Sequence, residues 1–173
     1  MTEALLLVDV IKSFRHEDGD ALLESYKRRH PALLSLLEAA RARGAPVVYA
    51  NDRNHHSASE EVVREAIEDG KAGELVAAVA PARGEPVVLK DTYSAFEATG
   101  LSSVLAHLGV ELLLVAGAAT EMCVFQTVLD AQRAGLDVTV RGDASASVDG
   151  ANERIALDYL ERVLGLDVVR APE

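Results

Sequence analysis

Short runs of β-branched and aliphatic residues alternate along the chain with longer stretches of helical period. Six such runs predict strands, at residues 5–10, 46–51, 86–90, 111–115, 137–140 and 167–170. These runs are nearly continuous in apolar residues, which is typical of parallel strands that are covered by helices on both faces. The pattern therefore predicts an α/β protein with three α/β/α layers and a six-stranded parallel sheet.

Helices are predicted between the strands from their apolar stripes and their end residues. Pro31 suits a first helical turn, and the leucine-rich stripe that follows it ends at Gly44. Further helices are predicted at 101–108, 121–134 and 151–164, each followed by a glycine. Polar stretches at 15–20, 53–59 and 143–149 predict loops. In open sheets of this kind, ligands bind outside the carboxyl ends of the strands, so chemistry is expected there.

Composition narrows the possible partners. The 173 residues suit one domain, residues 1–173, with its own hydrophobic core. The chain carries 28 acidic and 17 basic residues, a formal charge of −11, which argues against binding nucleic acid or an anionic membrane. A small-molecule partner is therefore expected. The first residues run into an apolar strand without a secretory signal pattern, which predicts a cytoplasmic protein.

Three chemically capable side chains lie at or just after the ends of predicted strands: Asp9, Lys90 and Cys123. A carboxylate within an apolar strand needs a cation, a donor or a pocket, because burying it alone is costly. If Thr120 caps the following helix, Cys123 lies in the first turn, where the helix dipole favours a thiolate. Together they predict a base, an electrostatic support and a nucleophile for acyl transfer. Backbone N–H groups of the 118–119 turn and of Cys123 could bind the developing oxyanion.

Other interpretations of these residues stay open at this point. A lone cysteine at the start of a buried helix is often core filler, and the tip of Lys90 could be solvated. An aspartyl phosphotransferase would need a second acid at position 11, which is Ile11. The chain also has no phosphate-binding glycine loop, dinucleotide fingerprint or Gly-x-Ser-x-Gly motif.

The ordered set of motifs resembles the isochorismatase-like cysteine hydrolase superfamily, which includes nicotinamidases and N-carbamoylsarcosine amidase. The matching segments are the apolar strand ending in Asp9 with Phe14 following, Asn51-Asp52, Lys90-Asp91-Thr92-Tyr93-Ser94-Ala95-Phe96, Gly117-Ala118-Ala119-Thr120-Glu121-Met122-Cys123-Val124, and Gly142-Asp143-Ala144. The resemblance implies a Rossmann-like, isochorismatase-like fold and a triad of Asp9, Lys90 and Cys123. It also implies a cis peptide between Ala118 and Ala119, with the N–H groups of Ala119 and Cys123 as the oxyanion hole.

The implied activity is hydrolysis of a C–N bond in a small amide or carbamoyl compound through a thioester intermediate. The alternatives are an isochorismatase-type vinyl ether hydrolase and a catalytically silent small-ligand-binding protein of the same fold. Phe14, Tyr93 and Phe96 are candidates to cover the substrate, or else they pack in the ordinary way. Asn51 and Ala118 complete the expected substrate contacts. The resemblance further implies a homodimer or homotetramer.

The sequence departs from the resemblance at the metal-binding pattern. Metal-binding nicotinamidases carry Asp-x-His after the second strand, whereas this chain has Asp52-Arg53-Asn54-His55-His56. We therefore expect neither a metal nor another cofactor. The alternative is a zinc site built from Asp52 with His55 or His56.

Overall fold

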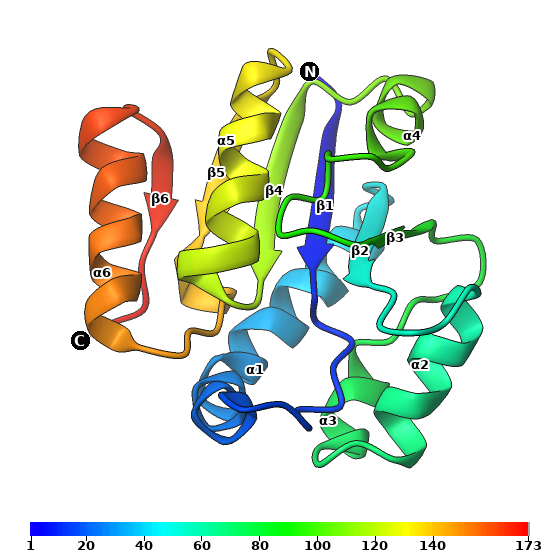
Figure 1. Cartoon of the computed structure of the whole chain (residues 1–173). Coiled ribbons are helices and arrows are strands. Elements are labelled where there is room, and N and C mark those ends of the chain that lie inside the picture. Colours follow the sequence, from blue (N-terminus) through cyan, green and yellow to red (C-terminus); the bar gives the residue numbers. More distant parts are fainter. Residues whose placement is uncertain (173) are drawn as a thin grey trace.

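The computed structural model describes residues 1–172 and contains a six-stranded parallel sheet (Figure 1). The strands are β1 (Glu3–Val8), β2 (Val47–Asp52), β3 (Val87–Lys90), β4 (Leu112–Gly117), β5 (Asp137–Arg141) and β6 (Asp167–Val169). Their order across the sheet is β3-β2-β1-β4-β5-β6, and every neighbouring pair is parallel. The predicted fold class is confirmed, and each strand begins and ends within two residues of its expected position.

Helices cover both faces of this sheet and define two separate cores. The first face packs against α1 (Gly19–Ala42), α2 (Ser59–Glu68) and α3 (Gly73–Ala78). The second packs against α4 (Leu101–His107), α5 (Phe125–Arg133) and α6 (Gly150–Asp158). Short π-helical turns, η1 (Thr120–Val124) and η3 (Tyr159–Val163), adjoin α5 and α6, and the 3₁₀ turn η2 (Gly142–Ala144) follows β5. Along β1, Leu5 and Leu7 enter the first core while Leu6 and Val8 enter the second, because side chains alternate along a strand.

The prediction that a helix begins at Pro31 is wrong. Helix α1 begins twelve residues earlier, at Gly19, and contains Pro31 in its interior. The buried side chains Leu22, Tyr26 and His30 precede the proline, and Leu33 continues the same face after it. Burial of this continuous apolar stripe outweighs the one backbone hydrogen bond that proline cannot donate. Helices α2 and α3, which the sequence analysis did not predict, are short and each buries only one or two side chains.

The order in which the strands are added to the sheet reverses between β1 and β4. Strands β2 and β3 lie on one side of β1, whereas β4, β5 and β6 lie on the other. Gly117, the last residue of β4, has φ +151°, and a Cβ atom there would lie 1.9 Å from the carbonyl oxygen of Val8. Glycine therefore allows the ends of β1 and β4 to meet closely at the point where open sheets bind ligands. Within residues 1–172, every helix is too short or too polar to cross a bilayer.

Candidate active site

Asp9, Lys90 and Cys123 converge at the carboxyl ends of β1, β3 and β4. Asp9 directly follows β1, Lys90 is the last residue of β3, and Cys123 lies in η1 after β4. Lys90 Nζ lies 2.8 Å from Asp9 Oδ2 and 3.7 Å from Cys123 Sγ. All three side chains are at least nine-tenths buried. The structure thus brings the three residues that the sequence analysis selected into one buried cluster, in which ligand atoms of Asp9 and Cys123 lie within 4.8 Å of each other.

A second carboxylate, Asp52, completes this polar cluster. Lys90 Nζ donates to Asp52 Oδ1 and, at 2.9 Å, to the carbonyl oxygen of Thr92. The backbone N–H of Asp52 donates to Asp9 Oδ1 at 2.7 Å, which orients the Asp9 carboxylate. The sequence analysis considered Asp52 only as a metal ligand. Its place at the end of β2, beside β1 and β3, is the signal that could have shown this role, because ends of neighbouring parallel strands lie together.

The surroundings of Lys90 and Cys123 change the pKa of the amine and the pKa of the thiol. Burial alone would lower the pKa of Lys90, but the charges of Asp9 and Cys123 and the contact with Asp52 raise it above its ordinary value. The ammonium is therefore retained. Burial, followed by the charge of Asp9, raises the pKa of the Cys123 thiol to about 12, against a smaller opposite effect of Lys90. The thiol is consequently protonated at neutral pH, so burial and the charge of Asp9 outweigh the effect that the sequence analysis expected from the helix dipole.

Thr120 does not cap the turn that carries Cys123, contrary to the sequence interpretation. Residue Ala119 is the cap of η1, and the Thr120 hydroxyl instead contacts the carbonyl oxygen of Ala146 at 3.1 Å and Glu153 Oε1 at 3.2 Å. The peptide bond between Ala118 and Ala119 is cis, as the resemblance implied. Among the described residues, no acceptor takes the N–H of Ala119, which borders the cavity next to Cys123.

A cavity of about 750 Å³ opens above Lys90 and Cys123. Its walls are formed by Lys12, His16, Asp18, Leu22, Asp52, Arg53, Asn54, Lys90, Asp91, Thr92, Tyr93, Ala119, Met122, Cys123 and Val148. Lys90, Tyr93, Ala119 and Cys123 were predicted as site residues and lie at this cavity. Among the other wall residues, His16, Asp18, Arg53 and Asn54 come from the segments 15–20 and 53–59. The sequence analysis assigned these segments to loops but could not tell which side chains turn inward.

Four predicted substrate contacts do not reach the cavity. Phe14 is fully buried and packs edge-to-face on Tyr26, with ring centroids 5.1 Å apart. Asn51 directs its amide to the backbone N–H and carbonyl of Ile11, so it fastens the segment after β1. Phe96 packs against the second core, and Ala118 lies buried in the first. The physical reason is that burial in the cores stabilises the three apolar side chains, and that the backbone of Ile11 already pairs with the Asn51 amide.

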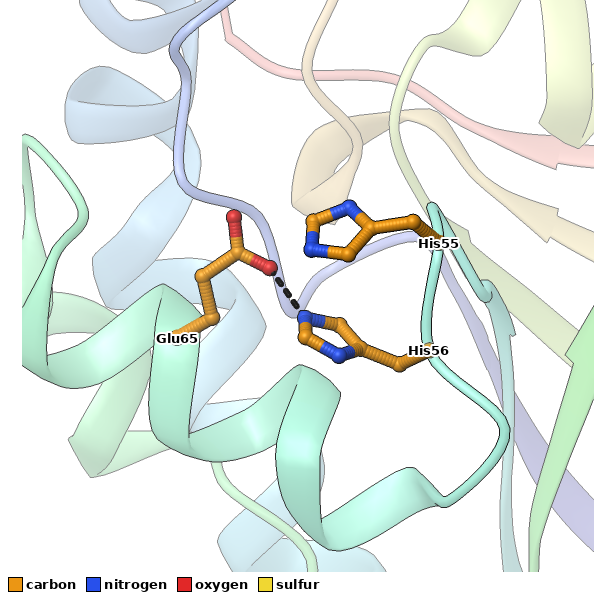
Figure 2. Close-up of side chains that lie close together, drawn as sticks. All are labelled: His55, His56 and Glu65. Carbon is orange, nitrogen blue, oxygen red and sulfur yellow. Dashed lines mark hydrogen bonds and ion pairs between the residues drawn. The ribbon is translucent and has the colours of Figure 1, made fainter.

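In the part of the chain that the structure describes, two clusters of side chains have the spacing of metal ligands. One consists of Asp9, Asp52 and Cys123, and the Lys90 ammonium already lies among these groups. The other consists of His55, His56 and Glu65 (Figure 2). Within residues 1–172, no such cluster joins Asp52 to a histidine, so the structure does not support that zinc alternative.

Comparisons with known proteins agree with this geometry. The family model described as "Isochorismatase domain" matches residues 3–171. The chain is 29% identical to the uncharacterized isochorismatase family protein YaaI of Bacillus subtilis (strain 168), covering 96% of this chain and 92% of that protein. It is 33% identical to the probable inactive nicotinamidase At3g16190 of Arabidopsis thaliana, covering 83% of this chain and 80% of that one.

A solved structure shows the same fold over the whole chain. The crystal structure of N-carbamoylsarcosine amidase from Thermoplasma acidophilum superposes with a TM-score of 0.76 at 27% identity, covering 100% of this chain and 98% of that one. The matched family model spans nearly all of the sequence, and the cavity lies where this α/β architecture places ligand sites. The chain therefore belongs to the isochorismatase domain family, which is a family of hydrolases.

Proposed function

We propose that this protein hydrolyses the C–N bond of a small amide or carbamoyl compound through a thioester on Cys123. The observation that carries the proposal is the buried Lys90 ammonium, which lies 2.8 Å from the Asp9 carboxylate and 3.7 Å from the Cys123 thiol at the base of the cavity. A nucleophile, a base and a charge support within hydrogen-bonding reach are the parts that acyl transfer requires. The similarity to N-carbamoylsarcosine amidase supports the same type of reaction.

Because the Cys123 thiol is protonated, its attack on a carbonyl requires a general base, and Asp9 takes this role. As Cys123 Sγ attacks the carbonyl carbon, its proton moves to Asp9, and the carbonyl oxygen becomes the oxyanion of a tetrahedral intermediate. The C–N bond then breaks, and Asp9 returns the proton to the leaving nitrogen. In the second half, a water molecule gives a proton to Asp9 and attacks the thioester carbonyl. The departing sulfur takes that proton back, which releases the acid and restores the thiol.

Lys90 and the backbone next to Cys123 stabilise the charges that develop. The Lys90 ammonium compensates the Asp9 carboxylate at rest and faces the sulfur at 3.7 Å. In this proposal the N–H groups of Ala119 and Cys123 donate to the oxyanion. Because the side chains of Asp9, Lys90 and Cys123 are buried, the interactions among them are stronger than they would be at the surface.

The experiment is a screen of the full chain with small primary amides, carbamoyl compounds and isochorismate. Ammonia release from an amide or a carbamoyl compound, together with an acyl adduct on Cys123 in the mass spectrum, is the expected result. Cys123→Ala and Asp9→Asn should each abolish turnover without changing the circular dichroism spectrum, whereas His107→Ala, on the exposed side of α4, should retain it.

Three outcomes would overturn the proposal. Turnover by Cys123→Ala would exclude the thioester route. Pyruvate release from isochorismate without ammonia release from any amide would favour the vinyl ether alternative. Binding of amides without turnover would favour a silent binding protein, a possibility that the similarity to a probable inactive nicotinamidase keeps relevant.

A further inference from the structure

A cluster of two histidines and one glutamate lies outside the cavity over Cys123. His55 and His56 lie in the loop after β2, and Glu65 lies on α2; their side chains point toward one another (Figure 2). His56 Nε2 lies 2.5 Å from Glu65 Oε2, and the two imidazole rings have centroids 4.1 Å apart. One ligand atom from each of the three residues lies within 4.8 Å of the other two.

We propose that His55, His56 and Glu65 form a binding site for a divalent zinc-like ion. Two imidazole nitrogens and one carboxylate oxygen suit Zn²⁺, which binds such donors at about 2.0–2.2 Å and accepts water as a fourth ligand. Donor atoms around one tetrahedral ion at those bond lengths stand about 3.3–3.6 Å apart. On binding the ion, the His56 to Glu65 pair therefore opens slightly and the exposed His55 ring moves closer to both, which side-chain rotation allows.

A second carboxylate supports the assignment of His56 as a ligand. Glu61 Oε2 lies 3.8 Å from Nδ1 of His56, the ring nitrogen opposite the one that faces Glu65. A carboxylate beside the far nitrogen of a metal-bound imidazole fixes the ring orientation and increases its basicity. Glu61 and Glu65 lie on the same helix, one turn apart, so both nitrogens of His56 face carboxylates of α2.

The ion would bind apart from the catalytic cluster. His55, His56 and Glu65 are absent from the walls of the cavity over Cys123. The other cluster with ligand spacing contains the Lys90 ammonium, which repels a cation. Arg53 and Asn54, which do line the cavity, immediately precede His55. A bound ion would thus fasten the loop that forms this wall to α2 without touching the thiol.

Metal titrations test the proposal on the full chain after chelator treatment. Zinc is added in a calorimeter, and cobalt(II) is added as a spectroscopic probe of the same site. One zinc per chain is expected, with visible cobalt bands but no sulfur-to-cobalt charge transfer, since Cys123 is not a ligand. Glu65→Gln, which keeps the shape and an acceptor for His56, and His55→Ala should each weaken zinc binding at least about 10-fold.

Matched controls separate loss of a ligand from loss of the fold. Cys123→Ala and His107→Ala should bind zinc like the unchanged protein, and zinc should raise the melting temperature of both but not of the ligand variants. Failure of the unchanged protein to bind zinc would overturn the proposal. A sulfur-to-cobalt charge-transfer band would also overturn it. So would a zinc affinity of Glu65→Gln and His55→Ala that equals the affinity of the unchanged protein. Because no step uses amide turnover, these outcomes are independent of the proposed catalytic activity.

Discussion

Replacing Lys90 with methionine tests whether the buried ammonium stabilises the polar cluster that it forms with Asp9 and Asp52. Methionine keeps most of the side-chain volume but removes the charge that pairs with Asp9 at 2.8 Å and with Asp52. The side chains of Lys90 and Asp9 are fully buried, whereas Asp52 is 37% exposed. Water can compensate Asp52 in the variant but not Asp9, so the loss falls mainly on the Asp9 carboxylate.

The size of the effect follows from this burial. Breaking a buried ion pair by removing one partner costs about 3–5 kcal/mol, because the other charge is left without compensation. For a protein of about 150–250 residues, each kcal/mol lowers the melting temperature by roughly 2–4 °C, so Lys90→Met should lower it by about 6–20 °C. Adding Asp9→Asn removes the stranded charge, so the double variant should be more stable than Lys90→Met alone.

Thermal and urea unfolding of the single and double variants measures this coupling. Lys71→Met is the matched control, because Lys71 pairs with Asp20 at 2.6 Å on the surface and its loss should change the melting temperature little. The reasoning is refuted if Lys90→Met unfolds like the unchanged protein. It is also refuted if Asp9→Asn and Lys90→Met destabilise additively, since an ion pair requires that the two changes interact.

Two further predictions concern the thiol and the junction of β1 with β4. The pKa of Cys123 is about 12, against an ordinary 9.0, because of burial and then Asp9. At pH 8 the thiolate is therefore about a thousandfold rarer than for an ordinary thiol. Its alkylation by iodoacetamide should keep accelerating beyond pH 9 and should be faster in Asp9→Asn; a plateau near pH 9 would contradict this. Gly117→Ala should destabilise the fold by at least about 1–3 kcal/mol, because its Cβ would overlap the Val8 carbonyl. Gly100→Ala, with open space around its Cβ, should unfold like the unchanged protein; equal melting temperatures of the two variants would contradict the overlap.

The sequence was most informative where one physical effect dominates. Apolar runs long enough to be covered on both faces predicted all six strands, and the placement of Asp9, Lys90 and Cys123 at the strand ends predicted that these side chains converge. Prediction failed where two opposing effects act on the same residues and their relative size depends on tertiary packing. Proline is favoured in the first turn of a helix and disfavoured in its interior, yet the buried stripe from Leu22 onward extends α1 through Pro31.

The sequence alone determined the α/β architecture and which residue types stand at the strand ends, because hydrophobic period and chain order are local properties. Only the tertiary structure decided that Asp52 shares the Lys90 ammonium, that Phe14 packs in the core, and that burial keeps the Cys123 thiol protonated. These outcomes depend on distances and on exclusion of water between segments far apart in the chain. Such quantities exist only once the strands have assembled.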